Sequence, residues 1–99
     1  MARYQIMFWQ EFPSQVKASD EQETVRRMLP DRFQQAIDGA AMAEGSVDST
    51  AYLEGWQWGP TEERQGSAQE VAGALVAEFD AAYPKSRLAQ MVRARSRTG

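Results

Sequence analysis

The segment that most constrains the fold runs from residue 52 to residue 60 and reads Tyr-Leu-Glu-Gly-Trp-Gln-Trp-Gly-Pro. Its large and small side chains alternate with a period of two, which is typical of a β-strand. In such a strand Tyr52, Glu54, Trp56 and Trp58 point to one face, and smaller side chains point to the other. The segment therefore predicts a strand with one broad aromatic face, closed by a Gly-Pro turn.

Two further strands are predicted near the N-terminus. Residues 3–12 alternate in the same way and are rich in aromatic and β-branched side chains, which strands favour. After a turn at Pro13, residues 15–18 predict a second strand that forms a hairpin with the first. Residues 19–29 stay open between a short helix capped at Ser19 and a polar loop.

Two helices with apolar faces follow. The first begins at Pro30 and ends near Gly45, a proline and a glycine at the positions where helices tolerate them. The second opens with an S-x-x-E capping box from Ser67 to Glu70 and ends at Pro84. The order strand, strand, helix, strand, helix predicts an α+β two-layer sandwich. Its three-stranded, mainly antiparallel sheet has the order 2-1-3, with both helices on one face.

Charge divides the chain near residue 84. Residues 1–84 hold six basic and fourteen acidic residues, a net charge of −8, whereas residues 85–99 carry +5. We expect residues 1–84 to form one α+β domain and residues 85–99 a basic C-terminal tail or short helix. Removing residues 86–99 is therefore expected to leave the fold intact.

The basic residues of the tail suggest no nucleic-acid partner. They are Lys85, Arg87, Arg93, Arg95 and Arg97. Nucleic-acid interfaces combine such charges with interleaved aromatic residues or a recognisable motif, and the tail has neither. Because the body is acidic as well, the sequence argues against binding of RNA or DNA.

The chain contains no cysteine and no histidine. This composition excludes disulfides, thiol nucleophiles, histidine bases and zinc sites built from thiolate or imidazole ligands. With no catalytic motif either, the sequence favours a non-catalytic protein that needs no metal or cofactor. No apolar run approaches the roughly 20 residues of a membrane span, and the N-terminus lacks the apolar core of an export signal, which predicts a cytoplasmic location.

The predicted sheet has one face that two helices do not cover. If the helices pack on the face of Ile6 and Phe8, the other face stays open as a surface for a partner or ligand. The candidate binding residues on it are Met7, Trp9, Tyr52, Glu54, Trp56 and Trp58. The alternative is that these large side chains form the core and the other face is solvated. Gly55 favours the open face, since a strand glycine often lets another element approach closely.

Several short motifs resemble a known family. They are Tyr4-Gln5-Ile6-Met7-Phe8-Trp9, Pro13 with Gln15-Val16-Lys17, Leu29-Pro30 with Arg32-Phe33-Gln34 and Ala36-Ile37-Asp38, and Tyr52-Leu53-Glu54-Gly55-Trp56 with Trp58-Gly59-Pro60. Over about residues 3–84 the chain resembles the virulence factor domain family, which includes a domain of conserved virulence factor C, a larger bacterial protein. The family is named from a phenotype, so the resemblance implies no catalytic residues. It does imply an accessory role beside corrinoid-dependent methyltransferases and folate one-carbon enzymes.

We therefore expect a small cytoplasmic accessory protein that binds a protein partner, or a second copy of itself, through the open aromatic sheet face. The alternative is a small-molecule binding domain or minor enzyme that stacks a flat ligand on Trp56 and Trp58. In that alternative Glu54 is the polar handle that orients the ligand.

Overall fold

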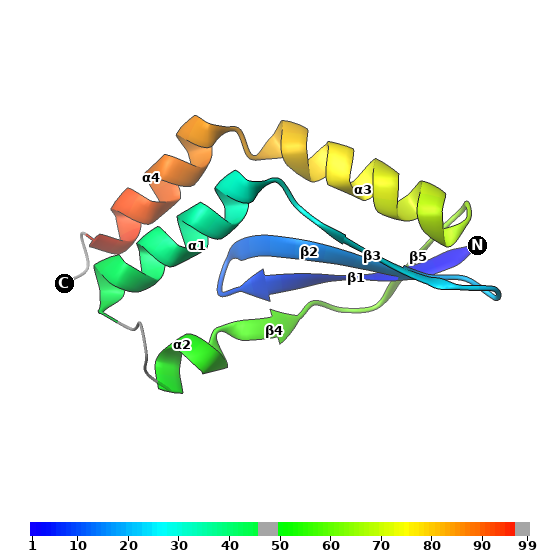
Figure 1. Ribbon diagram of the computed structural model, residues 1–99, viewed down its shortest axis with the longest axis horizontal. Helices are drawn as coiled ribbons and strands as arrows, with labels where there is room; N and C mark the ends of the chain where they lie inside the picture. The colour runs from blue at the N-terminus through cyan, green and yellow to red at the C-terminus, as the bar shows by residue number, and fades with distance from the viewer. Residues whose placement is uncertain (46–49, 97–99) are drawn as a thin grey trace.

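A computed structural model describes residues 1–45 and 50–96, which form a sheet of five strands and four helices (Figure 1). The strands are β1 (Ala2–Trp9), β2 (Phe12–Ser19), β3 (Thr24–Met28), β4 (Trp56–Trp58) and β5 (Glu62–Arg64). The helices are α1 (Asp31–Glu44), α2 (Thr50–Glu54), α3 (Ala68–Ala82) and α4 (Lys85–Ser96). The predicted α+β class and antiparallel sheet are confirmed, whereas the predicted three strands and two helices are too few.

β1 lies at the centre of the sheet. The strand order is β3-β2-β1-β4, β5 also pairs with β1, and every pair is antiparallel. β4 and β5 share one edge of β1, where β4 pairs with residues 7–9 and β5 with residues 2–4. Between them the Gly59 N–H donates to the Ile6 carbonyl at 2.8 Å. Because Pro60 has no N–H, the chain leaves this edge and returns to it at β5.

The core lies between the sheet and the helices. Ile6, Val16 and Ala18 are among its buried residues on β1 and β2, and α3 covers them with Val71 and Leu75. Figure 1 shows α3 running along the sheet, α4 beside α1, and α2 next to β4. The buried face of α1 is rich in alanine, as its sequence predicts, which allows close packing against neighbouring elements.

Residues 24–28 form strand β3. The sequence left residues 19–29 open between a capped helix and a polar loop, and neither alternative includes this strand. The Asp20 carboxylate accepts the N–H groups of Gln22 and Glu23 at 2.7 and 2.9 Å, so the chain turns back immediately after β2. Ser19 is therefore not a helix cap. Its hydroxyl lies 2.9 Å from the Thr24 hydroxyl, across the ladder that joins β2 and β3.

The predicted strand over residues 52–58 is wrong in its first half. Residues 50–54 form α2, which ends where the Gly55 N–H donates to the carbonyls of Ala51 and Tyr52 at 3.2 Å. Only Trp56–Trp58 is extended and pairs with β1. Alternation over so few residues does not separate a strand from one helical turn, and here packing against β1 selects the helix for the first half.

Both ends of α3 are held by side chains from other elements. At its N-terminus the predicted capping box is present: Ser67 accepts the Glu70 N–H at 3.1 Å, and Glu70 accepts the Ser67 N–H at 3.1 Å. Asp20 accepts the Ala68 N–H at 2.8 Å with its second carboxylate oxygen, so the β2–β3 turn is attached to the start of α3.

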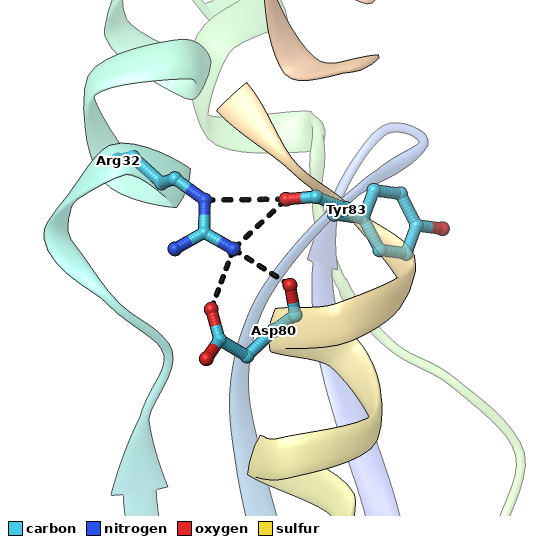
Figure 2. Close-up of polar contacts among 3 residues, drawn as sticks. All are labelled: Arg32, Asp80 and Tyr83. Atoms are coloured by element: carbon cyan, nitrogen blue, oxygen red, sulfur yellow. Dashed lines mark hydrogen bonds and ion pairs between the residues drawn. The ribbon is translucent and has the colours of Figure 1, made fainter. Parts of the chain in front are cut away.

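Arg32 holds the other end of α3 against α1 (Figure 2). Its guanidinium donates to the Tyr83 carbonyl at 3.0 and 3.2 Å, to the Asp80 carbonyl at 2.8 Å and to the Asp80 carboxylate at 2.6 Å. The last carbonyls of a helix have no partner within the helix, so an arginine placed here satisfies them and meets the negative end of the helix dipole. The contact joins residues 48 and 51 positions apart in the sequence.

The basic C-terminal segment is part of the packed structure. Pro84 ends α3, and its carbonyl accepts the N–H groups of Arg87 and Leu88, which begins α4. Leu88 is only 2% exposed and belongs to the core, and a Cβ on Gly39 of α1 would lie 3.5 Å from Val92. The expectation that residues 86–99 are dispensable is therefore not supported by this packing.

Candidate functional site

One face of the sheet carries three rows of side chains that cross the strands. Residues paired across antiparallel strands share a face, so the register defines the rows. The first row is Trp58, Met7, Gln15 and Met28; the second is Gln5, Lys17 and Arg26; the third is Glu63, Arg3, Ser19 and Thr24. We call these residues the open sheet face.

The open sheet face is accessible to solvent. Each of its residues is exposed or half-buried, whereas Ile6, Val16 and Ala18 on the opposite face are buried. Trp58 is 37% exposed and Met28 61% exposed, at the two ends of the first row. The ammonium group of Lys17 lies 5.4 Å from the centre of the Trp58 ring, within range of a cation–π contact. The first row therefore forms an apolar strip that only Gln15 interrupts, and it lies beside a row that carries the two cations Lys17 and Arg26.

The polar rows surround a shallow hollow. Its volume is about 240 Å³, and Arg3, Gln5, Lys17, Ser19 and Thr61 are among its lining residues. The Gln5 amide donates to the Gly59 carbonyl at 3.1 Å, which fixes that side chain. Two cations beside amide and hydroxyl groups suit a carboxylate better than a cation. Although the whole chain has a net charge of −3, this face carries three cations and one anion.

Trp9 does not belong to the accessible surface, in contrast to its predicted role. It is 0% exposed, its indole N–H donates to the Tyr52 carbonyl at 2.9 Å, and its ring centre lies 5.8 Å from that of Tyr52. Gly55 explains the burial, because only a residue without Cβ lets the end of α2 approach the indole this closely. The close approach that Gly55 predicts is real, but the approaching group is a tryptophan of the same chain.

The other predicted site residues divide between the sheet and α2. Met7, Trp56 and Trp58 share a face of the sheet, as predicted. Trp56 is half-buried and meets Tyr52 edge-on, with ring centres 6.2 Å apart. Tyr52 and Glu54 lie on α2 and not on a strand, so the predicted face of Tyr52, Glu54, Trp56 and Trp58 is wrong in those two members. Glu54 is exposed there.

Sequence reasoning missed the part of the surface that lies on β3. Arg26 and Met28 join the open sheet face only because residues 24–28 pair with β2. The alternation of Thr24, Arg26 and Met28 was the available signal, and the acidic turn before it obscured that signal by resembling the first turn of a helix. The sequence predicted no contact between Lys17 and an aromatic residue, whereas the Lys17 ammonium lies 5.4 Å from the centre of the Trp58 ring.

Residues 1–45 and 50–96 contain no group of three or more acidic side chains arranged to hold a metal ion. No helix in this part of the chain is long and apolar enough to cross a membrane.

The fold and this surface define a small α+β domain in which α3 covers one face of the sheet, and the other face is open except at Trp9, where α2 covers it. Residues 7–92 match the model of the family described as "Virulence factor", and the chain belongs to that family. The match continues to Val92, so it includes most of α4 and extends beyond the similarity expected from the motifs. No curated protein matches the chain, and no solved structure matches it.

Proposed function

We propose that this domain works in the cytoplasm as an accessory protein that binds a protein partner through the open sheet face. The observation that carries the proposal is the apolar strip of the first row, in which Trp58 and Met28 are exposed and Met7 is half-buried, on an otherwise polar sheet face. Exposed apolar strips with polar rims are typical of protein–protein surfaces, and a tryptophan is a common anchor. The location rests on the sequence alone.

The charges of the open sheet face indicate the chemistry of the partner. The hollow beside Arg3 and Lys17 suits a carboxylate, and the strip beside it suits an apolar side chain. We therefore propose a partner segment with acidic and apolar residues side by side. A second copy of this chain is one such partner, because the chain has a net charge of −3. The family resemblance suggests a corrinoid- or folate-dependent one-carbon enzyme as another.

A partner is favoured over a stacked ligand on the same face. A ligand site needs a concave pocket with convergent polar groups, but Trp56 packs edge-on against Tyr52 and Glu54 lies on α2. The hollow that this face does have is lined by Tyr4 and by polar and charged side chains, and it lies beside Lys17 rather than between the tryptophans.

The test compares two methionine substitutions that differ in position. Met28→Glu places a negative charge on the open sheet face, whereas Met42→Glu places one at a residue of α1 that is 72% exposed. Light scattering over a concentration series measures self-association, and binding to purified candidate enzymes is measured by calorimetry. We expect Met28→Glu and Trp58→Ala to weaken binding tenfold or more, about 1.4 kcal/mol, and Met42→Glu to have no effect. Equal binding by parent and both sheet-face variants contradicts the proposal.

Folding is monitored in the same variants. Trp58 is partly exposed, so Trp58→Ala is expected to cost only about 1–2 kcal/mol of unfolding free energy. Trp9→Ala removes a fully buried indole and is expected to cost about 3–5 kcal/mol. If Trp58→Ala is as destabilising as Trp9→Ala, Trp58 is a core residue, and the proposed partner surface then has no tryptophan available for binding.

A further inference from the structure

A second hollow lies on the opposite face of the sheet, between β1 and the C-terminal half of α3. Its volume is about 410 Å³, and aromatic side chains from both elements line it: Tyr4, Phe8, Phe79 and Tyr83. This volume is within the range of about 300–1,000 Å³ that is usual for small-molecule sites. Tyr4 also lines the smaller hollow of the open sheet face, but none of the four residues belongs to the three rows of that face, so substitutions in those rows test a different surface.

The residues of α3 explain why a hollow forms at this end. In its first half the helix presents Ala68 and Ala72, which are fully buried and allow close packing on the sheet. In its second half it presents Phe79, which is half-buried and whose ring stacks on that of Tyr83 at 5.9 Å. The rings of Phe79 and Tyr83, together with Pro60 in the connection between β4 and β5, border a space at this end of the helix. At the other end, the alanines of α3 leave no such space because they let the helix pack directly on the sheet.

The charge at the rim of this hollow is negative. Two carboxylates line it, and that of Glu78 is already neutralised by Arg64, whose Nη1 lies 3.0 Å from Oε1. The Glu62 carboxylate accepts the Tyr4 hydroxyl at 3.2 Å and forms no ion pair among the described residues. Burial and then the hydrogen bond to Glu62 raise the pKa of Tyr4, so its phenol stays protonated and neutral. One uncompensated negative charge thus faces an aromatic space.

From this geometry we propose that the hollow binds a small organic cation with an apolar body, the ammonium beside Glu62 and the body among the aromatic rings. Aromatic faces attract cations, and a carboxylate beside them adds a direct charge pair. The Tyr83 end already meets a cation of the chain, since the Arg87 guanidinium lies 4.1 Å from that ring centre and donates to the Ala82 carbonyl at 2.7 Å. The ligand's charge therefore belongs at the opposite end, near Tyr4.

The experiment uses three indole probes of similar size and different charge. Tryptamine is cationic, tryptophol neutral and indole-3-acetate anionic. Each is titrated into the ¹⁵N-labelled full chain while amide shifts are followed by NMR. We expect tryptamine to shift the amides around Phe8 and Phe79, and to bind roughly three- to fivefold more tightly than tryptophol, with indole-3-acetate weakest.

Matched variants separate the charge from the cavity. Glu62→Gln removes the rim charge and is expected to reduce tryptamine affinity to that of tryptophol. Glu63→Gln is the control, because Glu63 is the next residue on β5 and pairs with Arg3 on the other face. Ala82→Trp fills the hollow and is expected to abolish binding of all three probes.

The proposal is overturned by any of three results. These are equal affinity for the three probes, equal losses in Glu62→Gln and Glu63→Gln, and an absence of shifts around the hollow with tryptamine. Because Glu62 is exposed, Glu62→Gln is expected to fold, so the charge test holds even if Ala82→Trp does not fold. Loss of partner binding in the sheet-face variants is a separate outcome and leaves this test unchanged.

Discussion

At the scale of single residues, the contact between Gly55 and Trp9 shows that the absence of one Cβ atom allows an aromatic side chain to be buried. A Cβ on Gly55 would lie 2.6 Å from the indole nitrogen of Trp9 and 2.9 Å from two further ring atoms. The ring is fully buried and hydrogen-bonded to Tyr52, so it has no room to move aside. The absence of a Cβ at Gly55 thus allows α2 to pack on Trp9, whereas Trp58 on the same face is 37% exposed.

Gly55→Ala is therefore expected to destabilise the domain by about 1–3 kcal/mol through overpacking. Gly73→Ala is the matched control, since Gly73 is an exposed residue inside α3 and a Cβ there meets nothing within 4 Å. The control is expected to stabilise by about 0.4–1 kcal/mol, because alanine is the better helix former. Urea unfolding of the two variants measures whether each substitution lowers or raises the unfolding free energy. Destabilisation of similar size in the two would show that Gly55 is not sterically constrained.

The candidate surface was predictable in part at this scale. The period of two in Met7, Trp56 and Trp58 placed them on one face correctly, because strand pleating alone decides that relation. Whether each is exposed depends on what packs above it. Trp9 has the same parity as Met7, yet α2 covers it, and no local pattern in residues 3–12 carries that information.

At the scale of elements, α3 is attached at both ends to distant parts of the chain, and the N-terminal attachment depends on pH. Three backbone N–H groups, from Ala68, Gln22 and Glu23 in order of effect, hold the pKa of Asp20 below its usual value of 3.8. A carboxyl whose pKa is lowered by folding stabilises the native state above its unfolded pKa. That contribution is lost as the pH falls through the lower, folded pKa.

Asp20→Asn is expected to be less stable than the parent at pH 7, since the neutral amide accepts these N–H groups more weakly. The difference in unfolding free energy is expected to shrink as the pH falls from about 3.8, the usual pKa of the unfolded carboxyl, through the lower pKa of Asp20 in the folded protein, where the native carboxyl also becomes protonated. Glu70 and Glu78 also have lowered pKa values, owing to Ser67 and Arg64 respectively. Both glutamates are present in the parent and in Asp20→Asn, so their contributions cancel in the difference between the two unfolding free energies. A pH-independent difference would show that the charge of Asp20 contributes nothing.

At the C-terminal end of α3, Arg32→Ala removes every hydrogen bond drawn in Figure 2. We expect a loss of about 1.5–3 kcal/mol, the usual value for hydrogen bonds from a charged group. Asp80→Ala removes only a partly exposed ion pair and keeps the contacts to the backbone carbonyls, so a loss of about 0–1 kcal/mol is expected. Thermal melts distinguish the two. Equal losses would assign the effect to the ion pair and not to the carbonyls.

At the scale of the whole molecule, the sequence indicated the class but not the number of elements. Strong local signals were sufficient for β1, α1 and α3, where long periodic runs, the glycine cap at Gly45 and the Ser67 capping box agree with the final packing. The elements that the sequence did not predict are β3 and α2, each of five residues, and β5, of three residues. Segments this short take their conformation from the neighbour they pair with, so tertiary contacts decide them.

The same reasoning applies to the C-terminal segment, which charge alone marks as separate from the acidic body. Leu88 is buried in the common core and α4 packs along α1, while the family match continues to Val92. Cationic side chains on the outer side of a helix do not prevent its apolar side from completing a core, so a boundary drawn from charge need not be a boundary in packing. The segment is expected to contribute to stability.

Deletion of residues 85–99 is therefore expected to abolish the cooperative thermal melt. A domain of this size is stable by only about 5–15 kcal/mol, and the deletion exposes the α1 surface that α4 covers. Leu88→Ala provides the graded version, with an expected cost of about 2–5 kcal/mol for an almost fully buried leucine. Gln90→Ala, at an exposed position of the same helix, is the control and is expected to stay within about 0.5 kcal/mol of the parent. A truncated chain that melts at the parent temperature would show that α4 is an appendage and that residues 1–84 fold alone.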